Sequence, residues 1–295
     1  MEFADFYAGL DSLFAQKDLS AAEWYLARHL AAAKNCGDTS YQLAVLNEQA
    51  GYYRNLSQFS QAFTACEQAM AIIAAPDFTD NIAAATTMLN AATALHVGGR
   101  SSEALEMYGE VEKIYSATLG DTNPRQAALY NNMAQAWAAS GDKKTAFVYL
   151  HKSLAILKAS QEHCAELATT HSNIALLYMS LGNNEAAATH LQAALSGFEA
   201  LGYDDPHYPA ALAAMAQLLY LQENYAGAVE QYRLALNKIE TVFGQNADYA
   251  RTCRNCAHAC SMAGMWVEAG ELVQKAQTVE SKLNAVNSPA QETGQ

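Results

Sequence analysis

The stretch NNMAQAWAASGDKKTAFVYLHKSL, residues 131–154, decides the fold, because its pattern returns in SNIALLYMSLGNNEAAATHLQAAL, residues 172–195. Counted from Ala134 and Ala175, both stretches place a large apolar residue at +3, a glycine at +7 and an alanine at +12. The starting alanine recurs every 41 or 42 residues, at Ala8, Ala50, Ala92, Ala134, Ala175, Ala216 and Ala257. A fixed period of this length indicates a solenoid, in which each unit buries its apolar face against its neighbours.

Each repeat is predicted to hold two amphipathic helices, because apolar residues recur at spacings of three and four on both sides of position +7. Glycine is frequent at +7 and can adopt the positive φ of a helix C-cap there. The residues at this predicted turn position are Ala15, Ser57, Gly99, Gly141, Gly182, Glu223 and Gly264. The sequence therefore predicts an all-α chain.

The order small, aromatic, glycine, alanine in residues 131–154 and 172–195 resembles the tetratricopeptide repeat, whose usual period is about 34 residues. The longer period here, with LGDTNP at 119–124 and LGYDDPHYP at 201–209, is similar to the repeats of kinesin light chains. This resemblance implies a right-handed superhelical α-solenoid of about seven antiparallel helix pairs, forming one array over residues 1–284 with a flexible tail at 285–295. The repeats are expected near residues 2–35, 39–75, 80–118, 123–160, 163–201, 206–242 and 246–284.

The net charge of −13, from 17 basic and 30 acidic residues, disfavours nucleic acid and anionic membranes as partners. No apolar run reaches the roughly 18 residues that a membrane-spanning helix needs. The N-terminal segment MEFADFYAGLDSLF lacks the basic start and cleavage site of a secretory signal. We therefore expect a cytoplasmic protein.

The segment CRNCAHAC, residues 253–260, raises the question of a metal site, because it holds Cys253, Cys256 and Cys260 beside His258. Relative to Ala257 the three cysteines fall at −4, −1 and +3, where other repeats hold apolar residues that face the paired helix. Buried, inert thiols are therefore expected, without metal or cofactor. Metal or redox chemistry is the alternative. His171 is expected in the core, because apolar residues hold its position in other repeats.

No nucleotide-binding, zinc-protease or serine-hydrolase motif is present, so the chain is not expected to be an enzyme. Catalysis by residues gathered from distant repeats is the alternative.

The family resemblance implies that the first helix of each repeat lines a concave groove, at −6, −3, +1, +4 and +5 from the marker alanine. After the first repeat these positions hold three arginines, several amides and no carboxylate. Amides can pair with a peptide backbone, and arginines can bind carboxylates. Kinesin-light-chain repeats carry cargo-binding asparagines at −3 or −2. The resemblance therefore adds the asparagines at these two offsets to the predicted groove. The predicted groove residues are Asn47, Arg54, Asn55, His96, Asn131, Asn132, Gln135, Asn173, Gln217, Arg251, Arg254 and His258. A channel lined with solvated residues would show the same pattern.

The leading interpretation is a non-catalytic protein-interaction module, or scaffold, that binds a protein or peptide in its groove through an extended, acidic segment. One alternative is a peptide-sensing regulator similar to bacterial pheromone receptors, although the repeats begin too early to leave room for their N-terminal effector segment. Another is a structural subunit that self-associates through its repeats, and the oligomeric state is left open.

Overall fold

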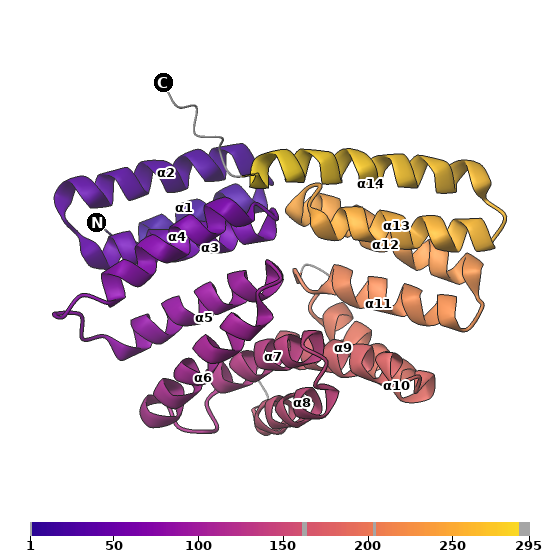
Figure 1. Cartoon of the computed structure of the whole chain (residues 1–295), viewed down its shortest axis with the longest axis horizontal. Coiled ribbons are helices and arrows are strands. Elements are labelled where there is room, and N and C mark those ends of the chain that lie inside the picture. The colour runs from indigo at the N-terminus through magenta and orange to yellow at the C-terminus, as the bar shows by residue number, and fades with distance from the viewer. Residues whose placement is uncertain (1, 161–163, 203–204, 289–295) are drawn as a thin grey trace. The chain divides into compact units, whose positions relative to one another are not determined.

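The computed structural model describes residues 2–160, 164–202 and 205–288, and these residues form helices and short connections without a strand (Figure 1). The helices follow one another in seven antiparallel pairs, which confirms the all-α prediction and the two-helix repeat. They are α1 (Phe3–Ala15), α2 (Leu19–Cys36), α3 (Thr39–Asn55), α4 (Phe59–Ile73), α5 (Asn81–Val97), α6 (Ser101–Thr118), α7 (Pro124–Ala139), α8 (Lys143–Ala159), α9 (Cys164–Ser180), α10 (Asn184–Ala200), α11 (Tyr208–Leu221), α12 (Tyr225–Phe243), α13 (Ala247–Met262) and α14 (Trp266–Asn287).

Most helices are preceded by a capping residue whose side chain accepts a hydrogen bond from a free backbone N–H group of the first turn. The Oδ1 atom of Asp142, for example, accepts a hydrogen bond from the Thr145 backbone N–H at 3.0 Å at the start of α8. The start of α7 combines such a cap, Asn123, with Pro124 in the first helical position, where a missing N–H costs nothing. The capping residues with such a bond are Asp18, Asp38, Asp80, Asn123, Asp142, Asn183, Asn224 and Asn246.

The turn between the two helices of each repeat contains one residue with a left-handed backbone. At Gly141, with φ of +93°, the chain reverses so that the Asp142 N–H donates to the Trp137 carbonyl at 3.0 Å and closes the end of α7. The seven left-handed turn residues are Lys17, Ser57, Gly99, Gly141, Gly182, Glu223 and Gly264. The predicted turn position is confirmed in six repeats and wrong in the first, where Lys17 takes the place predicted for Ala15.

In the first repeat, the buried marker position is also not the predicted alanine. Ala8 is exposed, whereas Leu10, seven residues before the turn residue Lys17, is buried. The prediction for Ala8 is therefore wrong, because the spacing between turn residues Lys17 and Ser57 is 40 residues and not 42. The other six marker alanines are buried: Ala50, Ala92, Ala134, Ala175, Ala216 and Ala257.

The repeats stack in a regular order. The two helices of a repeat pack against each other, as α3 with α4 and α7 with α8. Within each unit, second helices also pack against the first helix of the next repeat, as α4 with α5 and α8 with α9. Successive first helices also meet, as α7 with α9 and α9 with α11. This arrangement leaves one side of every first helix outside the core.

The chain divides into two compact units. Unit 1 comprises residues 1–114 and 284–295, and unit 2 comprises residues 115–283. Both divisions fall inside a helix, in α6 and in α14. α14 continues to Asn287, past the predicted start of the tail at 285, and the rest of that predicted tail, 289–295, lies outside the described residues.

Candidate interaction surface

The first helices of unit 2 expose the same two positions in every repeat, +1 and +5 from the marker alanine. These positions are four residues apart, so they lie on one side of each helix. We call their set the first-helix face of unit 2. Its members at +1 are Gln135, Leu176, Gln217 and His258, and its members at +5 are Ala139, Ser180, Leu221 and Met262. The structure thus brings together Gln135, Gln217 and His258 of the predicted groove on an exposed face.

Three large apolar side chains are exposed on this face. Leu176 is 42% exposed, Leu221 is 47% exposed and Met262 is 53% exposed, each on a different helix. The predicted site gave weight to amides and arginines and omitted these residues, although their offsets belong to the predicted groove lining. The signal that could have found them was an apolar residue at +1 or +5, where no packing partner is expected.

Carboxylates are scarce on the helices that carry this face. α7 and α11 contain neither aspartate nor glutamate. α9 and α13 each contain one acid, Glu166 and Asp248, and both lie in the first turn, away from the +1 and +5 positions. The face is therefore close to neutral in a chain whose net charge is −13.

Asn131 and Asn173 of the predicted groove hold neighbouring repeats together. Asn131 is buried, and its Nδ2 donates to Thr170 Oγ1 at 2.8 Å and to Ser153 Oγ at 3.1 Å. Asn173 is half-buried, and its Nδ2 donates to Asn131 Oδ1 at 3.3 Å. The hydrogen-bonding groups of Asn131 therefore face protein atoms, which gives this residue a packing role.

Asn47 has the same environment in unit 1. Its Nδ2 donates to Thr87 Oγ1 at 3.0 Å, and its Oδ1 accepts from Asn90 Nδ2 at 3.3 Å. Both partners belong to α5, the next first helix. Asn47 therefore also links consecutive repeats.

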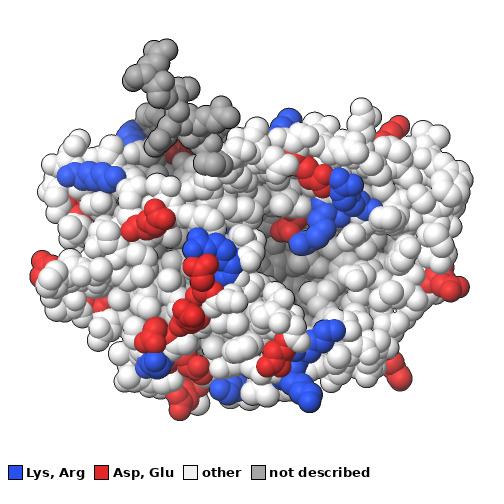
Figure 2. Space-filling model, viewed as in Figure 1, with Lys and Arg blue, Asp and Glu red and all other residues white. Residues whose placement is uncertain are grey.

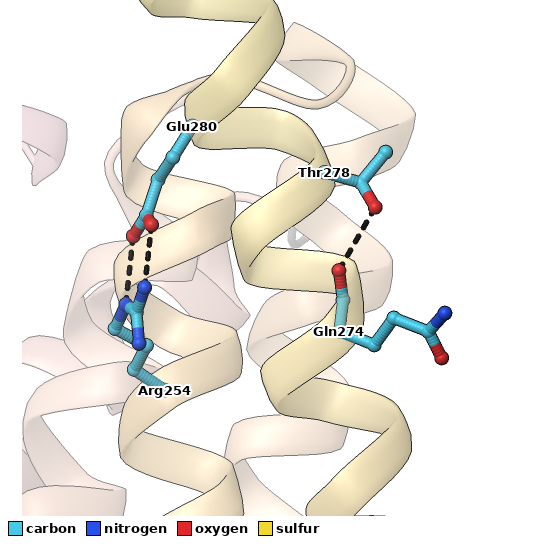
Figure 3. Close-up of polar contacts among 4 residues, drawn as sticks. All are labelled: Arg254, Gln274, Thr278 and Glu280. Carbon is cyan, nitrogen blue, oxygen red and sulfur yellow. Dashed lines mark hydrogen bonds and ion pairs between the residues drawn. The ribbon is translucent and has the colours of Figure 1, made fainter.

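The two predicted groove arginines of α13 are paired with carboxylates of their own chain. Arg254 makes a bidentate contact with Glu280 of α14, with Nε to Oε1 at 2.7 Å, and Figure 3 shows both bonds. These bonds hold the pKa of the Glu280 carboxyl below its ordinary value. Arg251 pairs with Asp248 one helical turn earlier, at 2.7 Å. In Figure 2, basic atoms accordingly lie beside acidic atoms over α13 and α14.

The other predicted groove residues differ in exposure. In unit 1, Arg54 is half-buried, and burial lowers the pKa of its guanidinium despite the nearby Glu48. His96 is half-buried, its Nδ1 lies 3.0 Å from Ser101 Oγ, and burial lowers its pKa. Asn55 is exposed at the end of α3. Asn132 of unit 2 is half-buried on α7.

The three cysteines of α13 are completely buried, which confirms their predicted place in the core. Burial raises the pKa of the Cys253 thiol to about 11 and raises the pKa of Cys256 and Cys260 as well. The reactive thiolate is therefore disfavoured at all three positions. Among the described residues, no three His, Cys, Asp or Glu side chains are grouped as metal ligands.

His171 is half-buried, so the prediction that it lies in the core is confirmed only in part. Its Nδ1 lies 2.9 Å from Nδ1 of His190 on α10. Burial lowers the pKa of both imidazoles, and the positive charge of nearby Lys158 lowers it further. One ring must donate and the other accept, so this contact requires at least one neutral histidine.

In the described part of the chain, no helix has the length and apolar composition needed to cross a bilayer.

The family model for the tetratricopeptide repeat matches residues 83–159 and 166–241, more than half of the chain. The chain belongs to the tetratricopeptide repeat family. No curated protein matches the sequence.

Several solved structures share this fold. BtubC (BKLC) of P. vanneervenii is 17% identical with a TM-score of 0.55, and the match covers 83% of this chain and 96% of BtubC. The apo form of RapI is 13% identical with a TM-score of 0.65, covering 97% of this chain and 100% of RapI. NprR, solved with its cognate peptide NprX, is 16% identical with a TM-score of 0.62, covering 96% of this chain and 83% of NprR. At these identities the likeness is one of fold, and the first of these structures agrees with the kinesin-light-chain-like character expected from the repeats.

Proposed function

We propose that this protein is a non-catalytic interaction protein that binds a segment of a protein partner on the first-helix face of unit 2. The observation that carries the proposal is the exposure of Leu176, Leu221 and Met262 on one face. Apolar side chains exposed together on a folded protein commonly mark a binding surface. The polar residues Gln135, Gln217 and His258 lie at +1 positions of the same face and can hydrogen-bond to a partner's backbone.

The partner segment is proposed to be apolar in part and not strongly charged. Cores of protein interfaces are depleted in charged residues and enriched in aromatic residues and methionine. An acidic partner would have to displace Asp248 and Glu280 from the arginines that they already bind. The acidic segment expected from the sequence is therefore less well supported than an apolar one.

The test compares two variants that place glutamates on different helices of unit 2. Leu176→Glu combined with Leu221→Glu places two carboxylates on the first-helix face. Val148→Glu changes an apolar residue on α8, a second helix, that is 55% exposed. Each variant serves as bait for partners from a lysate of the source cell, with circular dichroism to check that it is folded. We expect the double variant to lose a partner that the parent and Val148→Glu retain. Loss with Val148→Glu alone would place binding on the second helices and contradict the proposal.

A further inference from the structure

The contact between the first helices α1 and α3 differs from two later contacts of the same kind. Between α3 and α5, and between α7 and α9, an asparagine at −3 accepts a hydrogen bond from an asparagine at −2 of the next repeat, as Asn131 does from Asn173. In the first repeat, counted from the buried Leu10, position −3 holds Tyr7, and position −2 of the second repeat holds Glu48. An aromatic residue and a carboxylate therefore replace the asparagine pair.

The carboxylate of Glu48 has no partner of its own. Glu48 is half-buried, and its side chain makes neither a hydrogen bond nor an ion pair with the described residues. Neither oxygen is among the enclosed atoms that lack a partner, so both are open to solvent. Burial raises the pKa of this carboxyl, nearby Asp11 raises it further, and the opposing charge of Arg54 does not reverse the shift. A positive group at this place would therefore stabilise the ionised form.

Two aromatic rings of α1 are exposed beside this carboxylate. Tyr7 and Phe14 are each 39% exposed, and they share one side of α1 because seven residues make about two helical turns. The Phe14 ring stacks on Tyr52 of α3 with ring centroids 6.4 Å apart, so this side of α1 faces α3. Burial and then the negative charge of Glu48 raise the pKa of Tyr7, so the carboxylate lies near this ring.

The negative charge here is not balanced by α1. That helix contains Asp5 and Asp11 and neither lysine nor arginine. Asp11 is exposed one turn after Tyr7, and it forms no ion pair within the described part of the chain. Aromatic faces carry a negative quadrupole, and open carboxylates add net charge beside them. This surface therefore favours a cation, whereas the first-helix face of unit 2 is close to neutral.

The turn before α4, also in unit 1, is covered by the chain itself. Asn287 of α14 accepts at Oδ1 from the Ser60 backbone N–H at 3.3 Å, and its Nδ2 donates to the Ser57 carbonyl at 2.8 Å. All three residues belong to unit 1. Between the described residues, no hydrogen bond joins the end of α14 to α1, so this segment does not satisfy the carboxylates beside Tyr7.

We propose that Tyr7, Asp11, Phe14 and Glu48 form a second docking surface, the α1–α3 seam, which binds a basic segment of a protein partner. A lysine or arginine of that segment pairs with the carboxylates of Glu48 and Asp11, and its apolar stem lies along the exposed rings. The net charge of −13 attracts such a segment from a distance. The seam thus lies in a different unit from the first-helix face of unit 2 and takes a segment of different charge.

The test uses the full-length chain and a fluorescein-labelled peptide, GSKLGKLSG, followed by fluorescence anisotropy. A comparison peptide carries acetyl-lysine at both lysine positions, which removes the charge and keeps the apolar stem. We expect the lysine peptide to bind the parent at least about tenfold more tightly than the acetylated peptide. No binding of the lysine peptide, or equal binding of the two peptides, would overturn the proposal.

Substitutions locate the binding on the seam. Glu48→Gln should weaken binding of the lysine peptide about tenfold, and its fold should be kept because carboxamides occupy this position in other repeats. Glu106→Gln is the matched control, because Glu106 is exposed on α6 in unit 1 and forms no ion pair among the described residues. Tyr7→Leu should weaken binding about threefold, because it keeps apolar bulk and removes a ring. Equal weakening by Glu48→Gln and Glu106→Gln would mean that net charge alone governs binding, which contradicts the proposal.

Carbodiimide coupling provides a readout of where the peptide lies. The reagent joins a lysine amine to a carboxylate in contact with it as an amide, and takes up the water that is lost as a urea. Mass spectrometry of the digested product should find the peptide on Glu48 or Asp11. Products on acids of other helices, with none on these two residues, would overturn the proposal. All of these results concern unit 1, so they do not depend on the first-helix face of unit 2.

Discussion

Asn173 donates a hydrogen bond from Nδ2 to Oδ1 of Asn131 at 3.3 Å, which joins the first helices of two consecutive repeats. Asn90 and Asn47 form the same bond at 3.3 Å in unit 1. In both cases an asparagine at −3 accepts from an asparagine at −2 of the next repeat. In both, the acceptor's own Nδ2 bonds a threonine at −5 of that next repeat, Thr170 or Thr87. These asparagines therefore set the stacking of first helices.

Asn131→Ala should lower the free energy of unfolding by about 1–3 kcal/mol, because it removes the hydrogen bonds that Asn131 Nδ2 donates to the buried hydroxyls of Ser153 and Thr170. Gln135→Ala, on the same helix but exposed, should leave stability nearly unchanged. Urea unfolding followed by circular dichroism measures both. Equal midpoints for the two variants would contradict the packing role of Asn131.

Ala134→Leu should destabilise the protein by about 1–3 kcal/mol, because Ala134 is 2% exposed and packs in a cluster with Leu150 and Ile174. Helix propensity alone predicts almost no change, since leucine is a good helix former. Ala139→Leu, at an exposed position of the same helix, is the control and should melt as the parent does. The melting temperatures of the parent, Ala134→Leu and Ala139→Leu distinguish the cost of overpacking the core from an effect of helix propensity.

Cys253, Cys256 and Cys260 should react slowly with a thiol reagent at pH 8 in the folded protein and quickly once it is unfolded. Their burial blocks access, and their raised pKa values leave little thiolate. Cys36 is exposed and should react faster than these three cysteines in the folded state. Mass spectrometry of peptides from the partly labelled protein assigns the rates. Labelling of the α13 cysteines as fast as Cys36 would be inconsistent with their buried positions.

Stability should fall as the pH is lowered through about 6.5, the ordinary pKa of histidine. His171 and His190 have lowered pKa values in the folded protein, so the unfolded chain binds more protons in that range. His151 and Lys158 also face the pair and oppose its protonation.

His171→Leu should reduce this dependence, because an apolar residue already stands at this position in other repeats, as Leu46 and Leu212 do. The measurement is the melting temperature of parent and variant at pH 7.5 and pH 5.5. An equal drop in both proteins would show that other groups cause the pH dependence.

The sequence was sufficient to predict the repeat, the helix pairs and most of the buried alanines, because each of these features recurs with a fixed period. The first repeat departed from that period. Its turn residue is Lys17 and not a glycine, so no local signal showed that Leu10 replaces Ala8 at the buried position.

The candidate site was predicted only in part. The exposed positions +1 and +5 follow from helix geometry, so Gln135, Gln217 and His258 could be placed on one face. The bond of Arg254 to Glu280 joins two different helices, 26 residues apart, and could not be deduced from the first helices alone. The asparagine bonds can be found in the sequence only by comparing position −3 of one repeat with position −2 of the next repeat.

The contact of Asn287 with Ser57 and Ser60 has a consequence for how the protein is made. A ribosome synthesises the chain from its N-terminus, and early segments generally begin to fold before later ones exist. α3 and α4 emerge first, but Asn287, whose Oδ1 accepts from the Ser60 backbone N–H at the start of α4, is translated 227 residues after Ser60. Unit 1 must therefore wait for the end of α14 before its fold is complete, and a chain that terminates before Asn287 would carry its defect at the start of α4, far from the missing residues.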